Sequence, residues 1–166
     1  MSVTVSAAIA TKLVVTETLG TNVPAASNPQ VVHDALSQGV TLNSGSTPSA
    51  LQYAADLVTL SSGAASIDLT SVSGTNGAAV NGNGQKVIGF QWVRNGAGES
   101  HNISMAAAGS NGYAVGGTGS VIIMPPNSSG VIYFGGSAPV IGGTAKAISL
   151  TGTGAETVIL AFLFGS

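Results

Sequence analysis

Cysteine is absent from the sequence and charged residues are scarce. The lack of cysteine excludes a disulfide, a thiolate nucleophile and a zinc site built on cysteine ligands. Lys and Arg number 4 and Asp and Glu number 6, so charged residues make up 6% of the 166 residues, against roughly 25% in an ordinary globular chain. A net charge of −2 supplies no positive field, and we therefore expect no electrostatic binding to nucleic acid or to an anionic membrane.

Long uninterrupted apolar runs are also missing. A membrane-spanning helix needs about 18 apolar residues in a row, and the run at residues 158–164 is less than half as long. The N-terminal residues carry no basic stretch before their apolar ones, which is not typical of a signal peptide. The surface must instead be rich in Ser, Thr, Asn and Gly. Because so weakly charged a surface is poorly suited to a free monomer, we predict a homo-oligomer that buries much of it.

Residues with catalytic or metal-binding chemistry are few and scattered. No two of the six acidic residues lie within three positions of each other, so nothing indicates the paired carboxylates of a glycoside hydrolase. Glu99 and His101 would share one face of an extended segment and supply two metal ligands, but the Asn-Gly-Ala-Gly stretch before them favours a solvated loop. The sequence has neither the Gly-x-Ser-x-Gly elbow of a serine hydrolase nor the glycine spacing of a phosphate loop. We predict no enzymatic activity, no catalytic, cofactor-binding or metal-binding residues, and no cofactor.

Short strands separated by turns dominate residues 51–166. Asn-Gly pairs, which readily adopt a positive φ, mark turns between the strands. The strand predicted at residues 86–94 alternates apolar and other side chains, and the last strand is apolar at every position, so both of its faces should be covered. The residues predicted to lie in the core are Ile88, Phe90, Trp92, Ile103 and alternate residues of 158–164.

Residues 1–50 follow a different pattern. Loose alternation over residues 3–18 suits one or two strands, and turn-forming residues prevail from Gly20 to Pro48. Within that stretch Asn28 as a cap, Pro29 at the first helical position and Gly39 as a terminator predict one short helix. So long an irregular stretch is uncommon inside a compact domain, and we expect residues 1–50 to form an arm that acts between subunits.

The combination predicts an all-β fold. It comprises an irregular N-terminal arm over residues 1–50 with at most one short helix, and an antiparallel two-sheet β-sandwich, jelly-roll-like, over residues 51–166. Trp92, Tyr113 and Tyr133 could stack on sugars or bases. Without a basic groove beside them, we expect Trp92 to pack in the core and Tyr113 to anchor a loop.

A series of short motifs runs through residues 57–166. In order, they are residues 65–70 (ASIDLT), 74–77 (GTNG), 84–87 (GQKV), 102–104 (NIS), 109–113 (GSNGY), Pro125 and 148–154 (ISLTGTG). The series resembles a loosely defined set of small phage virion proteins, which implies a β-sandwich carried on the particle and no catalytic residues. Pro125-Pro126-Asn127 stands where those proteins often have Pro-Gly, and residues 1–56 lie outside the resemblance.

These observations together predict a structural protein located in a bacteriophage virion. We expect a capsid decoration or minor capsid component that acts by self-association and by docking on other capsid proteins. An alternative is a tail or fibre module whose loops bind a cell-surface glycan receptor. A small hydrolase is a third, more distant alternative.

Overall fold

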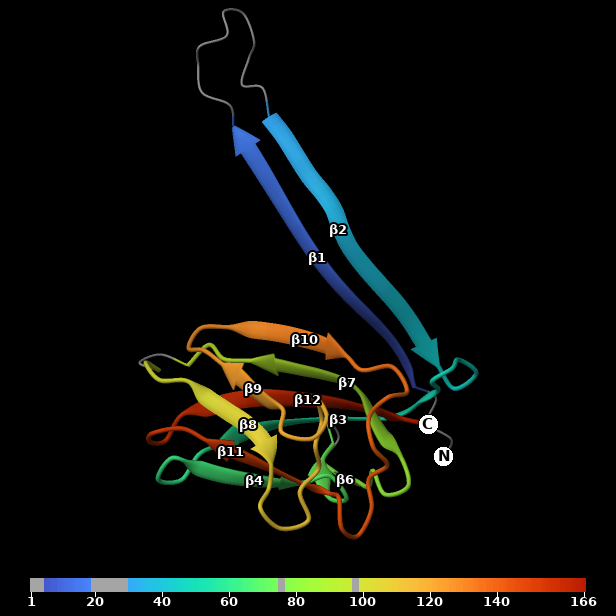
Figure 1. The fold of residues 1–166 in the computed structure, drawn as a ribbon, viewed down its shortest axis with the longest axis vertical. Helices are drawn as coiled ribbons and strands as arrows, with labels where there is room; N and C mark the ends of the chain where they lie inside the picture. The colour runs from blue at the N-terminus through green and yellow to red at the C-terminus, as the bar shows by residue number, and fades with distance from the viewer. Residues whose placement is uncertain (1–4, 19–29, 75–76, 97–98) are drawn as a thin grey trace, which may run out of the picture. The chain divides into compact units, whose positions relative to one another are not determined.

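The structure, a computed structural model, describes residues 5–18, 30–74, 77–96 and 99–166. Within them the chain forms strands and no helix, which confirms the predicted all-β class (Figure 1). The strands are β1 (Ser6–Thr18), β2 (Gln30–Asn43), β3 (Ala50–Thr59), β4 (Ala64–Asp68), β5 (Val72–Ser73), β6 (Ala79–Val80), β7 (Lys86–Val93), β8 (Ile103–Ala107), β9 (Val121–Met124), β10 (Ser129–Tyr133), β11 (Ala147–Thr151) and β12 (Thr157–Gly165).

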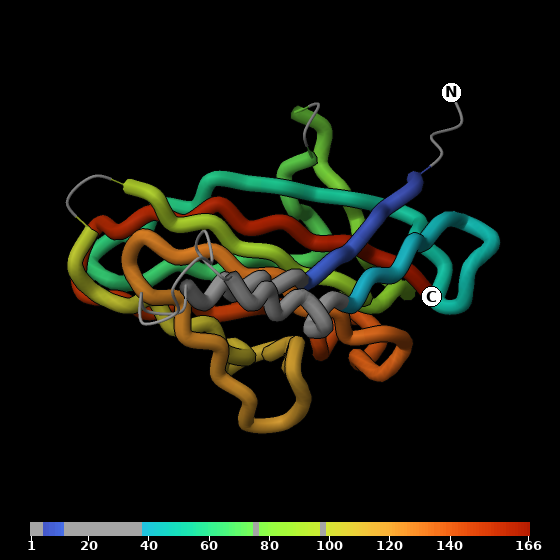
Figure 2. Tube along the Cα trace, turned by 90° about the horizontal axis from the view of Figure 1, so that it is seen from above, coloured from blue at the N-terminus to red at the C-terminus, as the bar shows by residue number. Residues whose placement is uncertain are grey.

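Two four-stranded antiparallel sheets form the sandwich. Their strand orders are β10-β7-β12-β3 and β4-β11-β8-β9, and the first order can be followed across the sheet in Figure 2. The two sheets stack with their apolar sides together, and the short β5–β6 pair forms a sheet of its own. The predicted antiparallel two-sheet sandwich is confirmed, and the arrangement is consistent with the jelly-roll-like form that we expected.

The connections that cross from one sheet to the other include β3–β4, β7–β8, β9–β10 and β11–β12. The strand register places them at one end of the sandwich. Thr59 at the end of β3 lies opposite Thr157 at the start of β12, and Thr151 at the end of β11 lies opposite Ala64 at the start of β4. We call this the crossing end; its described residues are 60–63, 94–96, 99–102, 125–128 and 152–156.

The hydrophobic core fills the space between the sheets. Phe90 and Phe162 pack at its centre with ring centroids 5.4 Å apart, and Trp92 stacks on Phe90 at 5.9 Å. Trp92 is only half-buried, because its partner strand β10 is an edge strand. The other predicted core residues are confirmed as buried: Ile88, Phe90, Ile103, Val158, Leu160, Phe162 and Phe164.

A β-bulge interrupts the alternation of β7. In its pairing with β12, Gly89 lies opposite Leu163 and Val87 lies opposite Phe164, so Ile88 is an extra residue on β7. Val87 therefore joins the core cluster, whereas Ile88 is buried outside it. The prediction that Ile88 shares the core face with Phe90 is wrong, because strict alternation cannot continue through a bulge.

The N-terminal strands form a separate two-stranded sheet, which we call the β1–β2 ribbon. Residues Ala8–Thr41 form a compact unit distinct from the rest of the chain, and β1 and β2 run in opposite directions (Figure 1). Gln30–Asn43 is a strand. The helix predicted over residues 28–39 is therefore wrong, and the irregular structure expected in this segment is wrong as well. Asn28 and Pro29 lie outside the described residues. The β-branched residues of this segment and pairing with β1 favour the strand.

Candidate functional site

The crossing end holds a buried arginine that the sequence reading did not single out. Arg94 follows β7 and is fully buried. Its Nη1 donates hydrogen bonds to the carbonyl oxygens of Met124 at 2.6 Å and of His101 at 2.9 Å, and its backbone N–H donates to the carbonyl oxygen of Ser128 at 2.8 Å. Arg94 thereby ties β7 to the β7–β8 and β9–β10 connections. Only one feature of the sequence indicated this role for Arg94: it is a charged residue at the end of a predicted strand, in a chain with few charges.

Glu99 is the counterion of this arginine. Its Oε2 lies 2.8 Å from Nη2 of Arg94, and its Oε1 accepts hydrogen bonds from the backbone N–H and the hydroxyl of Thr157, each at 2.7 Å. Burial alone would raise the pKa of Glu99, but the Thr157 hydrogen bonds and the Arg94 charge outweigh it and lower the pKa. The solvated-loop prediction is therefore wrong for Glu99, because a buried guanidinium requires a buried partner.

Glu156 organises the β11–β12 connection. Its Oε1 accepts hydrogen bonds from the backbone N–H of Thr153 at 3.1 Å and from its hydroxyl at 2.6 Å, and its Oε2 accepts one from the N–H of Gly154 at 2.8 Å. The Thr153 hydroxyl first, and then the Gly154 N–H, lower the pKa of Glu156 to about 2. His101 is solvent-exposed as predicted, with 60% of its side chain accessible, and its Nδ1 lies 3.8 Å from Oε1 of Glu156.

These polar residues hold the crossing connections together. The backbone N–H of Leu60 donates to the carbonyl oxygen of Glu156 at 2.9 Å, which adds the β3–β4 connection to those joined by Arg94 and Glu99. The carboxylates of Glu99 and Glu156 are thus occupied by protein donors. In the part of the chain that the structure describes, no group of three or more His, Cys, Asp or Glu residues could hold a metal ion. The arrangement is one that stabilises the fold.

A cleft of about 310 Å³ opens between the edge strands β3 and β4. Asp56 and Asp68 line it, together with the core residue Phe162. Oδ2 of Asp68 accepts a hydrogen bond from Nζ of Lys146 at 2.7 Å, and Oδ1 accepts two from Thr70. The Lys146 contact first, and then Thr70, lower the pKa of Asp68 to about 2. One of the two cleft carboxylates is therefore engaged in a salt bridge, which favours a structural role for it.

Tyr113 anchors its loop, as predicted. It is fully buried, its hydroxyl donates to the carbonyl oxygen of Pro139 at 2.8 Å, and the same hydroxyl accepts a hydrogen bond from the N–H of Val87 at 3.0 Å. The ring belongs to the core cluster. Tyr113 therefore has no surface left for stacking on a ligand.

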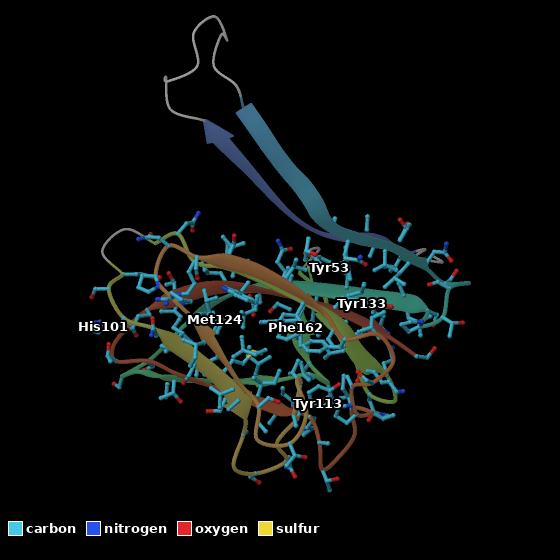
Figure 3. The ribbon with its side chains drawn as sticks, turned by 45° about the horizontal axis from the view of Figure 1, so that its top comes forward. Tyr53, His101, Tyr113, Met124, Tyr133 and Phe162 are labelled. Carbon is cyan, nitrogen blue, oxygen red and sulfur yellow. The ribbon has the colours of Figure 1, made fainter. Side chains whose placement is uncertain are left out.

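The outer face of sheet β10-β7-β12-β3 is apolar. Three rows of four paired residues cross this sheet on the side away from the core, and we call them the apolar face. The rows are Tyr53-Leu163-Gly89-Tyr133, Ala55-Ala161-Gln91-Val131 and Leu57-Ile159-Val93-Ser129. None of the twelve residues is charged. Figure 3 shows Tyr53 and Tyr133 on this side of the sandwich. Leu57 is 62% exposed and Ile159 is 41% exposed. Residues 160–165 of β12 are buried, so both faces of the last strand are covered as predicted, except at Ile159.

The outer face of the other sheet has a different composition. Its residues are mostly small: Ala64, Ser66, Asp68, Ser104, Ala106, Val121, Ile123, Ala147, Ser149 and Thr151. We call it the small-residue face. Its large apolar side chains, Val121 and Ile123, are confined to the edge strand β9. The two outer faces of the sandwich thus differ in how many of their strands have large apolar side chains.

The comparisons with known proteins give no match: no protein-family model, no curated protein and no solved structure is similar to this chain. The described residues contain no helix that is long and apolar enough to span a membrane.

Proposed function

We propose that the protein is a structural component of a bacteriophage virion, a capsid decoration or minor capsid protein that self-associates and docks on other virion proteins. The observation that carries this proposal is the β1–β2 ribbon. Its strands of 13 and 14 residues pair with each other in a two-stranded sheet. An isolated two-stranded ribbon is at best marginally stable in water and needs a further surface to pack on. A neighbouring subunit is the surface that the proposal assigns to it.

The chemistry of the chain supports an assembling role. Charged residues make up 6% of the sequence, and three of the ten, Arg94, Glu99 and Glu156, are buried or nearly buried within the crossing end. Lys146 and Asp68 pair with each other. Few charges remain to keep a free monomer soluble. The ordered motifs over residues 57–166 that resemble phage virion proteins point the same way.

A tail or fibre module that binds a glycan is the second candidate. The observation in its favour is that Tyr53 and Tyr133, both exposed, stand at the two ends of one row of the apolar face. Sugar sites combine such aromatic rings with polar groups that bind hydroxyls. The twelve residues of the apolar face include no acid, so we rank this function below the assembling role.

The test compares the full chain with a variant that lacks residues 1–50. We expect the full chain to sediment at a multiple of 16.1 kDa, and the shortened variant to keep its β-sheet circular dichroism but lose assembly. A full chain that sediments at the mass of one subunit over the whole accessible concentration range would contradict the proposal. Binding of the full chain to a glycan array, without self-association, would favour the second candidate.

A further inference from the structure

We infer that the apolar face is the surface on which a second copy of the chain docks, sheet against sheet. This inference rests on the proposed self-association and assigns to it a second contact surface, which acts together with the β1–β2 ribbon. The first step is the contrast between the two outer faces. Both belong to four-stranded sheets of one sandwich, so the same solvent would be expected to select similar residues on each. On the small-residue face, three strands have only Ser, Thr, Ala and Asp side chains, and Val121 and Ile123 are confined to the edge strand β9. On the apolar face, all four strands have Tyr, Leu, Ile or Val side chains.

The second step concerns the charge of the occupant. Burial of a charged group without a partner is costly, so a face with no charge requires a partner surface that also has none. The apolar face itself meets that requirement. A second copy offers a surface of identical size and composition, and contact of the same patch on both subunits produces the closed two-fold dimer that is the commonest assembly of soluble proteins.

The third step is the size and shape of the face. Strands about 4.8 Å apart and rows about 6.6 Å apart give the twelve residues a projected area of roughly 20 by 20 Å, or about 400 Å² per copy. The flat area of two copies is therefore about 800 Å². The relief of the side chains adds to this figure, which lies just below the roughly 1,000 Å² that is the minimum for a specific interface. Sheets packed face to face bury alternate residues of each strand at a separation of about 10 Å. On the apolar face, alternate residues of β3 and β12 face away from the core and are placed for such packing. They are Tyr53, Ala55 and Leu57 on β3 and Ile159, Ala161 and Leu163 on β12.

Charge substitutions on the two outer faces of the full chain test this inference. In L57E and Y133E, a carboxylate is placed on opposite edge strands of the apolar face, at side chains that are already exposed. The matched control is I123E, on the edge strand β9 of the small-residue face, where the side chain is 49% exposed. Sedimentation equilibrium should show the self-dissociation constant rising by at least about tenfold in L57E and Y133E, because each carboxylate would be buried unpaired. I123E should assemble like the unaltered chain.

A chemical probe provides a readout that does not depend on how well a charged variant folds. The chain has no cysteine, so L57C and I123C each carry a single thiol. The thiol of L57C should react with a maleimide progressively more slowly as the protein concentration rises and the face is covered. The thiol of I123C should react at one rate throughout.

The outcomes separate the inference from the proposed function. If the chain assembles but L57E and Y133E assemble equally well, and the thiol of L57C stays reactive, the docking face lies elsewhere and the inference fails while self-association stands. Loss of assembly in I123E to the same degree also overturns the inference. If the unaltered chain stays a single subunit at every concentration, the proposed self-association fails first and the inference fails with it.

Discussion

The indole ring of Trp92 occupies the space that a side chain on Gly130 would need. The two residues lie opposite each other in the pairing of β7 with β10, and a Cβ on Gly130 would stand far inside van der Waals contact with three atoms of the ring. The ring nitrogen of Trp92 donates a hydrogen bond to the hydroxyl of Ser128 at 3.3 Å. Glycine on the edge strand thus allows the only tryptophan of the chain to pack against the core from the crossing end.

The first prediction is that G130A destabilises the sandwich. The added methyl group would displace the Trp92 ring or bend β10, and overpacking of this kind typically costs about 1–3 kcal/mol in the free energy of unfolding. Guanidinium unfolding measures it. G136A is the matched control, because a Cβ on Gly136 meets nothing within 4 Å. Equal unfolding midpoints for G130A and G136A would show that the ring is not held against the strand.

The second prediction concerns the buried ion pair. R94M should lower the free energy of unfolding by about 3–5 kcal/mol, because it leaves the Glu99 carboxylate buried without its counterion and two carbonyl oxygens without their donor. The double variant R94M/E99Q, which removes the unpaired charge, should recover part of the loss in the same urea unfolding assay. K86M is the control, since Lys86 makes only an exposed hydrogen bond to the carbonyl oxygen of Gly136. An R94M protein as stable as K86M would refute the structural role.

The third prediction is a loss of stability in acid. The pKa of Glu156 is lowered from 4.5 to about 2 in the folded chain, so its stabilisation is fully present above about pH 4.5 and disappears as the pH falls towards 2. Asp68, whose pKa is also lowered to about 2, acts in the same direction. In thermal unfolding, E156Q should melt below the unaltered protein at pH 7, and the difference should narrow towards pH 2. A difference that stays constant from pH 7 to pH 2 would contradict this prediction.

The fourth prediction tests the Tyr113 anchor. Y113F removes one hydroxyl and leaves the Val87 N–H and the Pro139 carbonyl oxygen without that partner. We expect a loss of about 1–3 kcal/mol in the free energy of unfolding, the usual cost of a buried polar group left unpaired. Y53F, on the exposed face, should unfold at the midpoint of the unaltered protein. Identical chemical unfolding curves for Y113F and Y53F would mean that these hydrogen bonds add nothing to stability.

The sequence was sufficient for the fold class and most of the core. Period-two alternation and Asn-Gly turns are local signals, so Phe90, Ile103 and the even-numbered residues of 158–164 could be placed correctly. The position of Ile88 could not, because a bulge depends on how two strands align and leaves no local mark. The helix predicted over residues 28–39 failed for a related reason. Its caps were signals within the segment, whereas the strand depends on pairing with a second segment, β1.

The polar residues were the hardest to interpret. Glu99 follows a glycine-rich stretch, and local reasoning placed it in a solvated loop. In the structure, Arg94, five residues earlier, and Thr157, from the far end of the chain, converge on its carboxylate. Burial of a charge depends on partners that only the folded chain brings together. The apolar face was equally hidden, since its rows combine residues from four strands and become visible only in the register.

The position of β12 also has a consequence for biosynthesis. This strand lies between β7 and β3 and follows both in the chain, so each of them leaves the ribosome with an unpaired edge. The hydroxyls of Ser49 and Ser166, 2.7 Å apart in the structure, are separated by 117 residues in sequence. Contacts this distant form slowly, and open strand edges invite pairing with other nascent chains. We therefore expect the yield of soluble protein to depend on what shields the two strands until β12 has been translated.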